Sequence, residues 1–280
     1  MTVYLLTCRR FHVSASVPTY HPNIRVATEG HVTTVVIDNP DTKNACTGDM
    51  WVALGATFRD LAHSGTRAVL LTGAGGEFCA GADLTGSGGG GSVESSGHIL
   101  HALRVLGDVV LAVHDCPVPI VAKVDGVCIG AGLGLALATD MIWCSERARF
   151  SAIYAKRGLS LDFGTSWLLR QRIGIHKAKE LTFTGRVFGA DEALALGMVN
   201  AVVPTDQLDT ATREIIDAIA AGPPLALSSS KRELDNAAHT SLAQALETEA
   251  LAQSVNAQTD DLTEALMAYA ERRPTNFSGK

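Results

Sequence analysis

The sequence predicts an α/β fold followed by a helical C-terminal region. Short β-branched segments alternate with helix-patterned segments up to residue 205, whereas only helical patterns follow Pro204. The chain has 280 residues, of which 46% are hydrophobic and 19% charged, and this is enough to bury one large core. We expect a loosely ordered N-terminal extension over residues 1–24, an α/β core over 25–205 and a helical region over 206–280.

The core elements follow from their local patterns. Residues 31–37 are rich in β-branched side chains and end before the Asn39-Pro40 turn, which predicts a strand. Residues 50–63 carry apolar side chains at helical spacing. The same reasoning predicts further strands at 68–72, 119–124, 141–144 and 198–203, and further helices at 97–114, 133–138, 166–172, 177–184 and 191–195.

The C-terminal region reads as successive helices. Helical spacing predicts them at 207–221, 224–238, 241–255 and 258–272, with a break at Gly222-Pro223-Pro224 and an end at Pro274. Earlier in the chain, the glycine and serine run 86–92 predicts a mobile loop bordering the site.

Composition narrows the classes of function. A net charge of −6 offers no basic field for a phosphate backbone, so we expect no nucleic-acid partner. The longest uncharged run, 126–139, is too short to span a bilayer, and we expect no membrane partner. Six scattered cysteines without metal-type spacing predict reduced thiols in the cytoplasm. Residues 1–28 resemble a targeting segment only in being rich in arginine and free of acids.

Two glycine-rich turns follow buried strands, at 72–76 and 130–134. Neither matches a dinucleotide fingerprint or a phosphate-binding GxxxxGK[ST] loop, so we expect no nucleotide cofactor. Glycine and alanine here could aim backbone N–H groups at one point and form an oxyanion hole. They could equally serve only to pack a strand closely against a helix, and spacing leaves both readings open.

Four ordered segments carry a family resemblance: GEFCAGADL (76–84), PVPIVAKVDGVCIGAGLGLALATD (117–140), TFTGRVFGADEALALGMVNAVV (182–203) and MAYAERRPTNF (267–277). From about residue 25 to the end, the chain resembles the enoyl-CoA hydratase/isomerase, or crotonase, superfamily. The resemblance implies a spiral of repeated ββα units and a C-terminal helical region that assembles a homotrimer or a dimer of trimers. It also implies an acyl-CoA thioester substrate, with CoA as part of the substrate and no separate cofactor or metal.

The resemblance also assigns site residues. The oxyanion hole falls on the backbone N–H groups of Ala82 and Ala131, which would bind the thioester oxygen. Arg272 and Arg273 resemble basic residues that touch CoA near the C-terminus. The positions that would bind substrate are Lys43, Ala45, Ala80, Asp83, Leu84, Gly130, Tyr154, Leu161, Tyr269 and Phe277.

One departure from the family pattern bears on the reaction. Hydratases of this family use two glutamates, and those positions fall on Gly134 and Tyr154 here. Water addition needs a base that deprotonates water, which glycine cannot be and neutral tyrosine is poorly suited to be. Asp162 falls where isomerase branches carry an acid. We therefore expect a double-bond isomerase of fatty-acid metabolism, with Asp162 as its acid and base.

Alternatives for Asp162 remain open at this stage. Its side chain could cap the helix at 166–172. It could also act as a nucleophile, as in the family's dehalogenase branch, although Val105 stands where that branch has a histidine and only His98 and His101 lie nearby. For the whole protein, the alternatives are a hydratase of β-oxidation and a catalytically silent acyl-CoA-binding protein.

Overall fold

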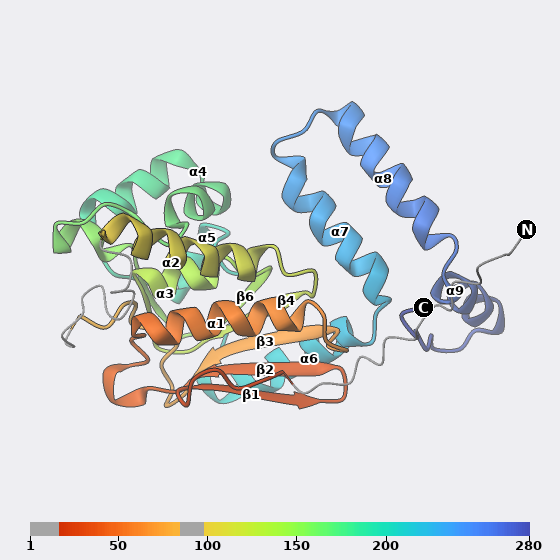
Figure 1. Ribbon diagram of the computed structural model, residues 1–280, viewed down its shortest axis with the longest axis horizontal. Helices are drawn as coiled ribbons and strands as arrows, with labels where there is room; N and C mark the ends of the chain where they lie inside the picture. The colour runs from red at the N-terminus through yellow and green to blue at the C-terminus, as the bar shows by residue number, and fades with distance from the viewer. Residues whose placement is uncertain (1–16, 85–97) are drawn as a thin grey trace, which may run out of the picture.

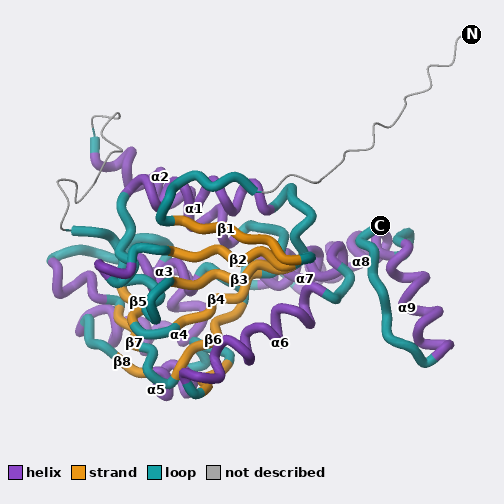
Figure 2. Tube along the Cα trace, turned by 90° about the horizontal axis from the view of Figure 1, so that it is seen from below, coloured by secondary structure: helices purple, strands orange, loops and turns teal. Residues whose placement is uncertain are grey.

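The computed structural model describes residues 17–84 and 98–280. In this part of the chain the main sheet has the strand order β1-β2-β3-β4-β6-β9, and a smaller sheet has the order β5-β7-β8 (Figures 1 and 2). Only β1 is antiparallel within the main sheet. The expected α/β class is confirmed. The loop predicted at 86–92 lies outside the described residues.

The strands are β1 Ile24–Glu29, β2 Val32–Ile37, β3 Ala68–Gly73, β4 Ile120–Val124, β5 Val127–Ile129, β6 Met141–Ser145, β7 Arg149–Ser151, β8 Phe188–Gly189 and β9 Ala201–Val203. The helices are α1 Gly48–Leu61, α2 Ile99–His114, α3 Ala131–Leu137, α4 Thr165–Thr184, α5 Ala190–Ala195, α6 Leu208–Ala220, α7 Pro224–Ala237, α8 Leu242–Asn256 and α9 Asp260–Glu271. Short 3-10 helices occur at Pro40–Thr42, Ile153–Arg157 and Thr205–Gln207.

Most differences between the predicted and the observed elements concern short strands and one helix kink. The sequence missed β1, β5, β7 and β8, and the last three have only three, three and two residues. The helices predicted at 166–172 and 177–184 are one span, α4, interrupted at Gly174, which has φ 74°. A left-handed residue ends the regular hydrogen bonding of a helix, so the two predicted pieces meet at this kink.

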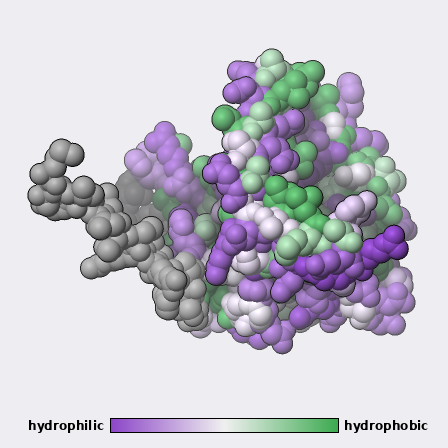
Figure 3. All heavy atoms as spheres, turned by 90° about the vertical axis from the view of Figure 1, so that its right-hand side faces the viewer, coloured by the Kyte–Doolittle hydropathy of each residue, from purple (hydrophilic) through white to green (hydrophobic). Residues whose placement is uncertain are grey.

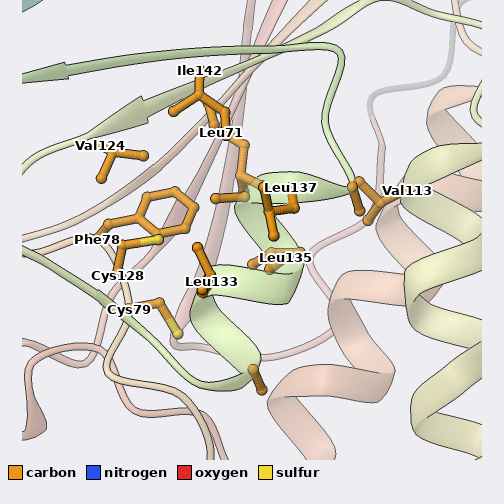
Figure 4. Close-up of a cluster of buried hydrophobic side chains, with 14 of the residues drawn as sticks. Leu71, Phe78, Cys79, Val113, Val124, Cys128, Leu133, Leu135, Leu137 and Ile142 are labelled. Atoms are coloured by element: carbon orange, nitrogen blue, oxygen red, sulfur yellow. The ribbon is translucent and has the colours of Figure 1, made fainter. Parts of the chain in front are cut away.

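The sheet is covered on both faces. On β4, Ile120, Ala122 and Val124 point into the larger core cluster, and Val121 packs on the other side with Ile216 of α6. This is the period-two alternation of a strand buried on both faces. Helices α1 and α2 pack against each other, and α6 packs on β2, β3, β4 and β6. In Figure 4, the leucines of α3 lie within the larger core cluster close to Phe78 and Cys128.

The described cysteines are reduced and buried: Cys46, Cys79, Cys116, Cys128 and Cys144. Cys46 hydrogen-bonds to Cys79. Burial raises the pKa of the Cys144 thiol to about 12 and that of Cys128 well above its ordinary value. Cys128 and Cys144 are therefore packing groups with little thiolate character.

Helices α7, α8 and α9 form an arm that projects from the core (Figure 1). A part-buried ion pair ties α7 to the core, between Lys231 Nζ and Asp140 Oδ2 at 2.9 Å. Neither α7 nor α8 buries a residue in the single chain. Figure 3 shows this side of the molecule, where hydrophobic residues are exposed among hydrophilic ones. The arm's exposed large apolar residues are Leu225, Leu234, Leu242, Leu246, Leu251, Val255, Leu262, Leu266, Met267 and Tyr269.

Candidate active site

Two turns meet at the carboxyl ends of the strands: the first turn, residues 79–82, and the second turn, residues 128–131. Cys79 joins them, because its N–H donates to Val127 O at 2.9 Å and its carbonyl accepts from Ile129 N at 3.0 Å. Gly81 has φ 97°, and a Cβ built on it would lie 3.4 Å from the nitrogen of Ala131. The first turn is thus in direct contact with the second, which overlaps the predicted glycine-rich turn at 130–134, whereas the one predicted at 72–76 lies just before the first turn.

In the part of the chain that the structure describes, no acceptor is found for the backbone N–H groups of Ala82 and Ala131. Ala131 is the first residue of α3, and N–H groups of a helix's first turn have no partner inside the helix. Gly130 before it has φ 59° and ψ −124°, a conformation open essentially only to glycine. The two alanines therefore present donors of the kind an oxyanion hole requires.

Asp162 reaches this corner through the turn that begins α4. A Cβ built on Gly134, one turn along α3, would lie 2.5 Å from the carbonyl oxygen of Phe163 and 2.9 Å from Thr165 Oγ1. The segment 162–165 is therefore pressed against α3. No side chain can project from position 134, because Phe163 and Thr165 of the turn that follows Asp162 fill that space.

Phe163 holds the turn in a strained shape. It has φ 51°, which is uncommon for a residue other than glycine, and Gly164 follows at φ 71°. The Phe163 ring is buried against Trp51 of α1, with ring centroids 4.5 Å apart. A left-handed residue of this kind costs about 1–3 kcal/mol and persists where packing enforces it. The aromatic contact thus fixes the backbone on which Asp162 is carried.

The carboxyl group of Asp162 has a raised pKa. Burial raises its pKa, and a hydrogen bond from Tyr154 lowers it in part. Its outer surface is still exposed to solvent in the single chain. The alternative role as a helix cap is wrong, because the N-cap of α4 is Gly164 and no side chain caps it.

Tyr154 is buried, and its hydroxyl group has hydrogen-bond partners. Its hydroxyl lies 3.2 Å from Thr165 Oγ1 and faces Asp162. Burial, followed by the charge of Asp162, raises the pKa of Tyr154 well above its usual value of about 10. Tyr154 therefore stays neutral and serves as a hydrogen-bond donor. Leu161 is partly buried against the core on the other side of Asp162.

The predicted CoA-binding positions near the first turn do lie together. Ala80 N donates to the carbonyl of Lys43 at 3.0 Å, and Asp83 N donates to the carbonyl of Cys46 at 2.9 Å, so the segment around Ala45 runs beside the first turn. The Lys43 ammonium is 61% exposed and lies 3.5 Å from a carboxylate oxygen of Glu77.

Leu84 is the last of the predicted CoA-binding positions near the first turn. Both Leu84 and Ala82 are exposed. These side chains therefore form an accessible rim to the first turn. Sequence reasoning missed Asn44, whose buried amide donates to the carbonyls of Ala74 and Glu77 and holds the rim in place.

Tyr269 and Phe277 are not brought to this corner within one chain. Tyr269 is 87% exposed on the arm, and the carbonyl of Phe277 accepts from Arg67 at the start of β3. The first turn lies beyond the other end of that strand, roughly 20 Å away for six residues of strand. A role for either residue at the site requires a neighbouring chain and stays a prediction.

Cavities and titratable clusters elsewhere do not coincide with the turns. A cavity of about 610 Å³ lies between the core and α7, lined by residues such as Trp167, His114 and Lys231. Over residues 17–84 and 98–280, no three His, Cys, Asp or Glu side chains are grouped to hold a metal, and no helix is long and apolar enough to cross a membrane. His98 instead caps α2, accepting from Leu100 N.

Comparisons with known proteins place the chain in a family. The family model for enoyl-CoA hydratase/isomerase matches residues 27–280. The peroxisomal Delta(3,5)-Delta(2,4)-dienoyl-CoA isomerase of Arabidopsis thaliana is 30% identical over 91% of this chain and 95% of its own length. The short-chain-enoyl-CoA hydratase of Clostridium acetobutylicum is 30% identical over 90% of this chain and 95% of its own. The crystal structure of enoyl-CoA hydratase from Bacillus anthracis is 30% identical, covers 92% of this chain and 100% of its own, and superposes with a TM-score of 0.86. The chain therefore belongs to the enoyl-CoA hydratase/isomerase family, within the crotonase superfamily.

Proposed function

We propose that this enzyme moves the double bond of a 3-enoyl-CoA thioester into conjugation, giving the 2-enoyl-CoA. The observation that carries the proposal is the closed position at Gly134, against which the chain packs the turn carrying Asp162. In this proposal a single carboxylate, that of Asp162, serves the site beside a neutral Tyr154. A single acid/base is sufficient for an isomerisation and insufficient for adding water.

The proposed steps use one proton and no outside reagent. The Asp162 carboxylate removes a proton from C2 of the substrate, and the electrons move onto the thioester oxygen to give a dienolate. The N–H groups of Ala82 and Ala131 stabilise that oxygen, an effect worth about 3–4 kcal/mol per donor in enzymes of this type. The protonated Asp162 then returns the proton at C4, which forms the conjugated product.

The raised pKa of Asp162 supports this assignment. Burial makes its carboxylate a stronger base than an aspartate in water, which favours proton abstraction near neutral pH. Tyr154 contributes by donating its hydroxyl to the main-chain carbonyl of Asp162, which helps to hold that residue in place without acting as a second base.

The test compares the wild type with Asp162→Asn, using the exposed Asp206→Asn before α6 as a matched control. A 3-enoyl-CoA and a 2-enoyl-CoA are each assayed through the absorbance of the conjugated thioester, and CoA binding is followed by calorimetry. We expect kcat for isomerisation to fall by about 10²–10⁴ in Asp162→Asn, with binding retained and Asp206→Asn unaffected. Hydration of the 2-enoyl-CoA that persists in Asp162→Asn would refute the proposal in favour of a hydratase. Binding without turnover would favour a silent binder.

An isotope experiment tests the single base directly. With deuterium at C2 of the 3-enoyl-CoA, one carboxyl that removes and returns the proton delivers deuterium to C4 of the product. Mass spectrometry of the product detects this transfer. Complete absence of deuterium at C4, together with solvent hydrogen there, would point to separate groups for the two proton transfers.

We further propose that the arm assembles copies of this chain into a trimer or a dimer of trimers. Its exposed leucines leave apolar surface in water in the single chain, and contacts between copies would bury it. Assembly would also bring Tyr269 or Phe277 of one copy towards the site of another. Light scattering should give a mass of three or six times the 29.4 kDa chain, and a monomer at micromolar concentration would refute this assembly.

A further inference from the structure

A charged network lies behind the two turns, centred on Asp125 and Arg147. Arg147 Nε donates to Asp125 Oδ1 at 2.7 Å, and Arg147 Nη2 donates to Oδ2 at 2.8 Å. Asp125 Oδ1 also accepts from the hydroxyl of Ser145 at 2.5 Å and from the N–H of Gly126 at 3.0 Å. The pair is therefore bidentate and further supported by neutral donors, the arrangement in which an ion pair has a defined geometry.

Two tethers connect the chain before the first turn with the chain before the second. Arg147 Nη2 donates to the carbonyl of Gly76, so the guanidinium bridges Gly76 and Asp125. In the other direction, Glu77 Oε2 accepts from the N–H of Val127 at 2.6 Å. We call Glu77, Asp125 and Arg147 the clamp.

The local backbone is built around these tethers. A Cβ on Gly76 would lie 2.5 Å from Arg147 Nη2, and a Cβ on Gly126 would lie 1.9 Å from Glu77 Oε2. Both glycines also have positive φ, 73° and 57°. Any other residue at either position would push a charged group of the clamp away from its backbone partner.

The pKa shifts of Asp125 and Arg147 agree with this arrangement. Burial alone would raise the pKa of Asp125, but hydrogen bonds from Arg147 and Ser145 lower it overall. Asp125 also raises the pKa of Arg147. Asp125 and Arg147 are thus both charged at neutral pH.

We propose that the clamp consists of positioning residues that set the distance between the N–H groups of Ala82 and Ala131. It acts through the turns, because its tethers hold 76–77 against 125–127, and the Cys79 pairing continues that contact to the two alanines. The inference rests on the proposed function only in taking these two N–H groups as donors to the thioester oxygen. The clamp itself does not touch substrate.

The experiment uses a cinnamoyl-CoA thioester, whose conjugated carbonyl absorbs at longer wavelength when its oxygen accepts strong hydrogen bonds. Spectra are taken on the full-length wild type, Arg147→Met and Asp125→Asn. The control is Arg213→Met, because Arg213 also holds two partners, Glu29 and Asp217, but on α6. Isomerase kcat and KM and thermal midpoints are measured on the same samples.

We expect Arg147→Met and Asp125→Asn to lose at least half of the red shift and about tenfold in kcat, with KM within about twofold. Arg213→Met should keep both, and Arg147→Lys should restore part of the shift. A full red shift and wild-type kcat in Arg147→Met and Asp125→Asn would overturn the clamp's role. Loss that tracks the thermal midpoint alone, and appears equally in Arg213→Met, would also overturn it.

The same data separate this inference from the proposed reaction. A wild type that shifts the chromophore without isomerising 3-enoyl-CoA would refute the reaction, while the variant spectra would still decide the clamp. A wild type without any shift, although it binds the probe by calorimetry, would refute the oxyanion hole and the clamp together.

Discussion

Replacing Gly134 by alanine tests how closely α3 and the Asp162 turn are packed. The added Cβ would lie 2.5 Å from the carbonyl oxygen of Phe163, about 0.9 Å short of the 3.4 Å at which ordinary contact begins. The turn cannot yield freely, because Phe163 is held at φ 51° by its contact with Trp51. We expect a loss of about 1–3 kcal/mol in the free energy of unfolding, the usual range for overpacking.

Displacement of the turn that carries Asp162 should also lower the rate of the reaction. A shift of about 1 Å at Asp162 lowers turnover by up to about a hundredfold, because proton transfer depends on a near-attack geometry. Urea denaturation and the 3-enoyl-CoA assay measure both effects. Gly107→Ala is the matched control, a glycine within α2 with nothing near its Cβ position. It should gain about 0.5–1 kcal/mol. Wild-type stability and activity in Gly134→Ala would refute the packing argument and reopen position 134 to a side chain.

Two further substitutions have outcomes fixed by charge. Tyr154→Phe removes the hydrogen bond that lowers the pKa of Asp162, so the acid limb of the pH profile of kcat/KM should move to higher pH; an unmoved or lowered limb would contradict this. Lys231→Met removes the cationic partner of the part-buried Asp140 carboxylate, which keeps the N–H of Ile120, and should cost about 1–3 kcal/mol at pH 7. Burial already raises the pKa of Asp140, so its favourable contribution is present below the unfolded pKa and is lost as pH rises through the folded one. The deficit of Lys231→Met measured by urea should therefore shrink at pH 5, and an equal deficit at both pH values would contradict this.

Hydrophobic periodicity was sufficient to predict the larger elements. The strand predicted at 68–72 is β3, and the helices predicted beyond Pro204 are α6 to α9, because long segments carry many matches to a period. Strands of two or three residues, such as β8, carry no such signal. Their pairing depends on partners distant in sequence, which a local pattern cannot show.

The site was predictable only in part, for the same reason. The family resemblance marked Ala82 and Ala131 in advance, but their contact depends on the fold. Asp162 stood out as a lone carboxylate between apolar residues. The closed space at Gly134 and the tether from Arg147 to Gly76 depend on segments that only tertiary structure brings together. A cap by Asp162 was a sound local expectation, and it fails because the chain turns left-handed at Phe163 before α4 begins.

Labelling of the buried thiols can measure local opening of this enzyme. Cys79 and Cys128 belong to the two turns, whereas Cys144 is in β6, so the three report on different parts of the core. A thiol reagent can modify them only after the surrounding packing has separated, and the rate of labelling then reports the free energy of that opening. Site-resolved mass spectrometry of labelled peptides would show whether the corner with the turns breathes independently of the sheet. Substrate analogues should slow labelling at Cys79 before they slow it at Cys144.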